Sequence, residues 1–326
     1  MKARLALTLA LASLWHRKKV LALVCLTLTL SVSLLLGIQY LRTEVKQSFT
    51  STISGTDLII GARSGQLNLL LYTVFHIGDA TNNIRWDSFE QISSQPQVKW
   101  AIPLSLGDSH RGFRVLGTNQ AYFDHYRFGR DQALTLSQGK RFSDLYDAVL
   151  GADIARELGY QLGTELVLAH GAGAVSFVKH ADKPFHVVGI LAKTGTPVDR
   201  TIHISLEGME ALHVDWQQGM PARGAGQVSA EQARQLDLTP TAITAFMLGL
   251  ERRIDTFTLQ RKINEFSGEP LLAILPGVAL QELWSLLSVA EKALLLVSVF
   301  VVLTGLVGML TAILSGLNER RRRHRR

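Results

Sequence analysis

Residues 293–317 read ALLLVSVFVVLTGLVGMLTAILSGL and contain no charged side chain. At about 1.5 Å per residue, a helix of this length can cross a hydrocarbon core of about 30 Å. The basic run Arg320–Arg326 follows almost at once. An apolar stretch that ends in positive charge is typical of a membrane helix whose basic end lies in the cytoplasm. The sequence therefore predicts a transmembrane helix over 293–317 and a basic cytoplasmic tail over 318–326.

A second uncharged stretch lies near the N-terminus, over residues 20–39, directly after Arg17, Lys18 and Lys19. We predict a first transmembrane helix there that begins in the cytoplasm. Residues 1–19 are predicted to form a cytoplasmic or interfacial helix, because Trp15 suits the level of the lipid headgroups. A cleaved signal peptide is the alternative. The apolar run is long, and no A-x-A site follows it at Gln39-Tyr40-Leu41-Arg42. Both observations favour an uncleaved anchor.

The positive charge of the chain is concentrated at its two ends. Residues 1–39 hold five Lys or Arg and no acid, and residues 318–326 hold six Arg and one Glu. The remaining stretch, 40–317, has 23 basic and 26 acidic residues, a net charge of −3. This distribution indicates membrane topology and a lipid bilayer as partner, and it argues against binding of nucleic acid.

Between the two predicted spans, residues 40–292 are numerous enough to fold around a core of their own. With both flanks in the cytoplasm, this domain is expected to be extracytoplasmic: periplasmic in a Gram-negative cell, where the spans would cross the bacterial inner membrane, and extracellular otherwise. Cys25 is the only cysteine, so the domain contains no disulfide. Short strands alternate with helices, which predicts a mixed α+β fold with helical stalks leading to the membrane. The expected strands include 98–106, 174–178, 185–191, 201–204 and 242–250, and the expected helices include 86–94, 153–158, 206–213 and 254–266.

Motifs of catalysis and of cofactor binding are missing from the sequence. There is no G-x-x-x-x-G-K-[ST] phosphate loop, no H-E-x-x-H and no C-x-x-C. We therefore expect no catalytic residue, no cofactor and no metal site, and any ATP hydrolysis to be carried out by another subunit. The ten histidines follow no ligand spacing, and this favours surface or core positions for them: His16, His76, His110, His125, His170, His180, His186, His203, His213 and His324.

Small residues recur every four positions in both predicted spans, and so fall on one face of each helix. Such stripes let helices approach closely in lipid. Chance in helices rich in small residues is the alternative, but two stripes favour packing of the helices on each other or on a partner. The residues are Cys25, Thr29, Ser33 and Gly37 in the first span and Thr304, Gly308, Ala312 and Gly316 in the second.

Three stretches, in their order and spacing, resemble the FtsX-like and MacB-type permeases of ABC transporters. The first is Leu9–Lys19 running into the first span, and the second is Val149–Gly159 with Phe185–Leu191 after it. The third is the last span with Asn318–Arg322. The second stretch is similar to the family's periplasmic core domain. A loop within it resembles a subgroup signature: Thr194, Gly195, Thr196, Pro197, Asp199 and Arg200.

The resemblance implies a permease subunit that forms a dimer with a second copy and binds a cytoplasmic ABC ATPase subunit. It implies export or release of a lipophilic, peptide or lipoprotein substrate. The family normally continues beyond the Asn-Glu-Arg-Arg stretch with two more membrane helices, so the sequence predicts a C-terminally truncated or split permease. A two-span sensor and a membrane-anchored envelope scaffold without transport activity are the alternatives.

Overall fold

The computed structural model describes residues 52–171, 180–217, 220–221 and 226–323, with further residues scattered between 18 and 43. Two compact units make up the chain, Ser48–Leu283 and a unit of Met1–Gln47 with Trp284–Arg326. The helix predicted over 1–19, apart from Lys18, lies outside the described residues, as do the strand predicted over 174–178 and most of the first stalk.

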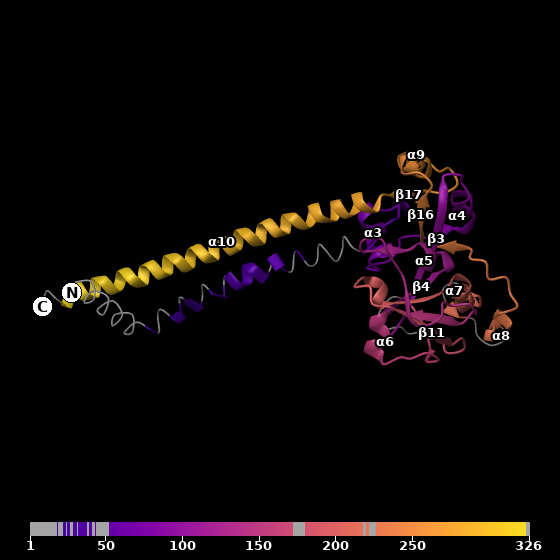
Figure 1. Ribbon diagram of the computed structural model, residues 1–326, viewed down its shortest axis with the longest axis horizontal. Coiled ribbons are helices and arrows are strands. Elements are labelled where there is room, and N and C mark those ends of the chain that lie inside the picture. The colour runs from indigo at the N-terminus through magenta and orange to yellow at the C-terminus, as the bar shows by residue number, and fades with distance from the viewer. Residues whose placement is uncertain are drawn as a thin grey trace. The chain divides into compact units, whose positions relative to one another are not determined.

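An eleven-stranded sheet forms the framework of the larger unit (Figure 1). Its strands follow the order β17-β1-β16-β3-β4-β12-β8-β11-β7, with β10 paired to β3 and β9 paired to β11. Their bounds are β1 Leu58–Ala62, β3 Val98–His110, β4 Phe113–Thr118, β7 Leu136–Gly139, β8 Asp147–Leu150, β9 Glu165–Leu166, β10 Ala169–His170, β11 Phe185–Leu191, β12 Thr201–Ser205, β16 Ala245–Leu250 and β17 Leu271–Ile274.

The longest of these strands, β3, belongs to both halves of the sheet. Its first part pairs with β16, from Val98 to Leu104, and its last part pairs with β4, from Ser105 to His110. The pairing with β4 is irregular between Leu106 and Ser109. An irregularity of this kind bends a strand and changes the direction of its side chains, and this one lies beside Asp108.

Helices pack on both halves of the sheet. In α7 the Ser205 hydroxyl caps the first turn by accepting from the Gly208 amide at 2.9 Å, a common helix start. The helices are α3 Gln66–Val74, α4 Trp86–Ser93, α5 Gln120–His125, α6 Ala152–Leu158, α7 Leu206–His213, α8 Ala230–Ala233, α9 Thr256–Asn264 and α10 Pro276–Arg323, with 3₁₀ turns at η1 Pro197–Arg200 and η3 Arg253–Asp255.

Three two-stranded pairs complete the described structure: β2 Ile84–Arg85 with β15 Ala242–Ile243, β5 Arg127–Phe128 with β6 Gln132–Ala133, and β13 Trp216–Gln217 with β14 Met220–Pro221. The predicted mixed fold and the helices over 86–94, 153–158 and 206–213 are confirmed within a residue or two. Two expectations were wrong in detail. The stretch 242–250 is two strands, because Thr244 interrupts it with a side-chain hydrogen bond to the Leu106 amide. The stretch 98–106 extends to His110.

One helix among the described residues, over Pro276–Gly308, is long and apolar enough to cross a membrane. Its first residues, up to Leu283, belong to the larger unit and the rest to the smaller one. Thr304 and Gly308 are exposed on it, and the helix continues through the positions of Ala312 and Gly316. The four small residues of the first stripe are also helical and exposed. No described atom outside its own helix lies within 4 Å of a Cβ placed on Gly37 or Gly308, so the packing of these stripes stays a prediction.

A fully buried histidine should make the folded domain sensitive to acid. Burial lowers the pKa of His203 on β12 from 6.5 to about 4, against the opposing effect of its contact with the Val149 carbonyl. In the unfolded chain the ring takes up a proton below about pH 6.5. The folded state resists this until about pH 4, so stability that is fully present above 6.5 is lost as the pH falls between these values.

We expect the unfolding temperature of the full chain in detergent, with a metal chelator present, to fall between pH 7 and pH 4.5. The variant His203→Leu should show a smaller fall. The corresponding difference in the free energy of unfolding should be on the order of a few kcal/mol. Circular dichroism during heating measures the unfolding temperatures of the wild type and of the variant. Equal pH dependence in the two proteins would show that His203 is not responsible.

Candidate functional site

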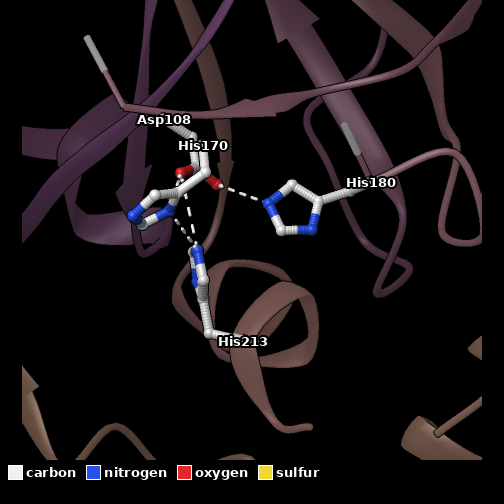
Figure 2. A group of neighbouring side chains, drawn as sticks. All are labelled: Asp108, His170, His180 and His213. Atoms are coloured by element: carbon white, nitrogen blue, oxygen red, sulfur yellow. Dashed lines mark hydrogen bonds and ion pairs between the residues drawn. The ribbon is translucent and has the colours of Figure 1, made fainter. Parts of the chain in front are cut away.

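Three histidines and one aspartate, far apart in the sequence, meet in the larger unit (Figure 2). They are Asp108, His170, His180 and His213, and one nitrogen or oxygen atom of each lies within 4.8 Å of those of the others. Figure 2 shows each imidazole directing a nitrogen toward the Asp108 carboxylate. Nitrogen and carboxylate ligands of this kind are those that transition metals use in proteins.

Backbone pairing fixes three of the four positions. Asp108 lies on β3 at the irregular pairing described above, and His170 on β10 is its direct partner across the strands. The amide of His180 donates to the Leu168 carbonyl at 2.9 Å, which sets His180 beside the same strand region. His213 is the last residue of α7.

Burial differs sharply within the cluster. The side chain of Asp108 is 0% exposed and that of His180 is 4% exposed. By contrast, the side chains of His170 and His213 are 46% and 26% exposed. The cluster therefore has a closed floor, formed by the carboxylate, and one side that is open to solvent.

The electrostatics of the cluster follow from its buried carboxylate. Burial would raise the pKa of Asp108, but the contacts with His170 and His213 and the charges of the imidazoles lower it to about 2. Burial lowers the pKa of His180 to about 4, against the charge of Asp108. For His213, burial is outweighed by the Asp108 carboxylate, and the pKa is raised. Asp108 is therefore ionised and supplies the negative charge at the floor.

The indole of Trp216 on β13 packs beside all three imidazoles. Its ring centroid lies 4.3 Å from that of His170, 5.4 Å from that of His180 and 5.1 Å from that of His213. This apolar wall restricts the rotation of the rings. It also lowers the local dielectric constant, which strengthens any interaction of the cluster with charge.

Sequence reasoning missed this cluster, because its members come from β3, β10, α7 and the segment around His180, with no short motif linking them. Only the density of histidines over 170–213 could have drawn attention to it: five of the ten lie there. Those five do not all converge. His186 is exposed on β11, and His203 is buried on β12.

The predicted signature loop forms a tight turn held by one buried carboxylate. Asp199 is 1% exposed. Its oxygens accept from the Thr194 amide at 2.8 Å, the Thr194 hydroxyl at 2.9 Å and the Gly195 amide at 2.7 Å. Gly195 has a φ of +73°, a conformation that glycine adopts without strain. The Thr196 hydroxyl caps the turn that Pro197 begins and Arg200 ends.

This loop borders a hollow of about 470 Å³. Cationic side chains of Arg114, Lys193 and Arg200 line it, together with the acids Asp153 and Asp199. Lys193 is paired with both acids, at 2.6 Å and 3.2 Å. Arg114 and Arg200 are paired with acids outside the lining, Asp79 and Glu157, at 2.8 Å and 2.5 Å. Because each of these cations has an acidic partner, the hollow has no strong preference for one sign of charge.

Comparison with known proteins identifies the family. The MacB-like periplasmic core domain matches residues 21–239. The chain belongs to this family. The match confirms the resemblance to FtsX-like and MacB-type ABC transporter permeases, which are membrane-associated transporter proteins of the bacterial inner membrane. The mixed α/β sheet of the larger unit is its MacB-like domain.

Two solved structures resemble this MacB-like domain at 12% sequence identity each. The periplasmic region of MacB from Actinobacillus actinomycetemcomitans has a TM-score of 0.41, and the alignment covers 71% of this chain and 94% of that one. The extracellular domain of the noncanonic ABC-type transporter YknZ from Gram-positive bacteria has a TM-score of 0.37, with coverage of 67% and 99%. No curated protein matches the chain.

Replacing the carboxylate that holds the signature loop should destabilise the MacB-like domain. In Asp199→Asn an amide nitrogen replaces one accepting oxygen, so at least one donor in the loop loses its partner. We expect a loss of about 2–4 kcal/mol, as for other buried charged hydrogen bonds. Thermal unfolding of the full chain measures it. Asp79→Asn is the control, because Asp79 is 72% exposed in its ion pair with Arg114 and should change stability by less than about 1 kcal/mol. Equal losses in the two variants would contradict the role of Asp199.

Proposed function

We propose that this chain is a permease subunit of an ABC transporter complex, in which ATP hydrolysis by a partner moves the MacB-like domain. The observation that carries the proposal is the family match over residues 21–239. The matched region begins within the predicted first span and covers most of the domain between the two spans. By analogy with the family, the substrate would be lipophilic, a peptide or a lipoprotein, exported or released at the outer face.

The partners follow from the same proposal. The sequence has no phosphate-binding loop, so a separate ABC ATPase subunit would bind and hydrolyse ATP, and the chain itself would not be an enzyme. A second copy of the permease would pack against the small-residue stripes of the spans, which are exposed at their described positions. Motion would pass to the domain through α10, a helix that runs without interruption from Pro276 to Arg323.

Purification of the chain from its native membranes, after mild cross-linking, tests the partnership. We expect an ABC ATPase to co-purify in roughly equal amount with the wild-type chain and with the exposed control variant Asp79→Asn. If no ATPase is recovered while the chain stays folded and membrane-inserted, the transport proposal fails. An envelope scaffold would then be the better account.

The proposed topology, with both termini in the cytoplasm, can be tested because Cys25 is the only cysteine. In a Cys25→Ala background, Gln235→Cys introduces a thiol at an exposed position of the domain. We expect a membrane-impermeant maleimide to label it in intact spheroplasts. The matched variant Arg326→Cys should be labelled only after the membrane is permeabilised. The opposite pattern would invert the topology.

A further inference from the structure

The buried carboxylate of Asp108 raises a question that the permease function does not answer. Its side chain is fully buried, and within the described part of the chain its two oxygens make no hydrogen bond of normal geometry. A buried ion costs several kcal/mol unless opposite charge or hydrogen bonds compensate it. Three imidazole nitrogens point at the carboxylate from 3.3 to 3.7 Å.

We propose that Asp108, His170, His180 and His213 form a binding site for a divalent transition-metal ion, with Zn²⁺ as the preferred ion. This site is independent of the proposed ATPase partnership, so either proposal can fail without the other.

The distances between the ligand atoms fit a tetrahedral ion. Zinc bonds of about 2.0–2.1 Å place neighbouring ligand atoms about 3.3 Å apart in a tetrahedron. Nδ1 of His170 lies 3.1 Å from Nε2 of His213. Oδ1 of Asp108 lies 3.3 Å from the first of these atoms and 3.5 Å from the second. These separations are too long for good hydrogen bonds to the carboxylate, but they match the edges of a coordination polyhedron.

His180 completes the set from the opposite side of the carboxylate. Its Nε2 lies 3.7 Å from Oδ2 of Asp108 (Figure 2). This nitrogen is buried and makes no hydrogen bond within the described residues. A small rotation of the imidazole or of the carboxylate would bring four ligand atoms around one point, as three nitrogens and one oxygen.

The tautomer of His213 also favours a cation. Its Nδ1 lies 3.0 Å from the Met209 carbonyl and can only donate to that oxygen. In the neutral ring, Nε2 therefore carries a lone pair, and this lone pair faces both His170 and the Asp108 carboxylate. Two electron-rich atoms facing each other repel, unless a proton or a cation lies between them. A backbone carbonyl that fixes the outer nitrogen of a histidine is a common feature of metal sites.

The ligand types and the access to the cluster select the ion. Imidazole suits Zn²⁺, Cu²⁺, Ni²⁺ and Fe²⁺, whereas Mg²⁺ and Ca²⁺ prefer oxygen ligands. A tetrahedral set of three nitrogens and one oxygen is most typical of zinc. Since His170 at the open side is 46% exposed, an ion can enter from the solvent. Trp216 covers one side of the site with apolar surface, and this strengthens the attraction between the ion and the carboxylate.

An ion-free network, in which a protonated His213 pairs with Asp108, is the competing explanation. It accounts for the charge of Asp108 but predicts no metal binding. The metal-site proposal predicts one bound metal ion per chain, whereas the ion-free network predicts none. The number of bound ions per chain can be measured directly.

The test uses the full-length chain in detergent, purified with an affinity tag that contains no histidine and stripped with a chelator. The protein is dialysed against equal concentrations of MgCl₂, MnCl₂, CoCl₂, NiCl₂ and ZnCl₂, and bound metals are counted by mass spectrometry. We expect about one Zn²⁺ per chain. Competition with a chromogenic chelator then gives the affinity. Loss of one ligand, in His180→Ala or His213→Ala, should weaken binding by at least about 100-fold, since even outer contacts of metal sites are worth 10–100-fold.

His186→Ala is the matched control, because this histidine is exposed on β11 outside the cluster, and it should bind zinc as the wild type does. Asp108→Asn keeps the shape of the floor but removes its charge, so a loss of affinity in this variant cannot be attributed to a cavity. Zinc should raise the unfolding temperature of the wild type and of the control but not of the ligand variants. Binding of Co²⁺ to the wild type should produce the intense visible absorption of a tetrahedral complex.

Several results would overturn the proposal. No stoichiometric metal in the wild type, or equal binding in wild type and ligand variants, would leave the ion-free network as the explanation. If His186→Ala lost as much zinc affinity as the ligand variants, the zinc would not be bound specifically by the Asp108 cluster. Preferential uptake of Mg²⁺ or Mn²⁺, or the weak spectrum of octahedral Co²⁺, would reject the assignment of a tetrahedral zinc-type site.

Discussion

The two halves of the large sheet are joined by the backbone hydrogen bonds of a single strand, β3. It pairs with β16 in its first part and with β4 in its last part, so neither half can keep its position if this strand shifts. A slip by one residue would exchange its buried and exposed faces. Ile102 and Leu104, both fully buried, fix the register through the core. The same register sets Asp108 opposite His170 on β10, and so the position of this fully buried carboxylate depends on apolar packing several residues earlier.

Two buried carboxylates of this domain show two ways of compensating charge. Asp199 is surrounded by donors from its own loop, all within 2.9 Å, and the turn is rigid as a result. Asp108 has imidazoles around it at longer range. The first arrangement is complete within a few residues of sequence. The arrangement around Asp108 needs segments from across the domain. Its longer distances fit the proposed metal ion and do not fit the hydrogen bonds that hold a turn. Similar burial therefore does not imply a similar role.

Most of the helices and the longer strands could be predicted from local sequence patterns, but the order of the strands in the sheet could not. Clear signals bound the helices over 86–94 and 206–213: Pro96 follows the end of the first, and Ser205 caps the start of the second. The strand over 185–191 is apolar apart from His186 and was placed correctly. Short strands such as β8 were not predicted, because four residues carry too little periodicity and are defined by their neighbours. The cluster around Asp108 was missed for a related reason: its members share no motif, and only strand pairing brings them together.

The position of β1 has a consequence for how this protein is made. It lies between β16 and β17 in the sheet, with Ile60 opposite Phe246 on one side and Ala273 on the other. Both partners are synthesised long after β1. The apolar strand Leu58–Ala62, fully or nearly fully buried in the finished domain, must wait unpaired while most of the domain emerges. Contacts between such distant segments form slowly and leave strand edges exposed to aggregation in the meantime. Folding of this domain therefore depends on protecting β1 from aggregation until its partners β16 and β17 have been synthesised.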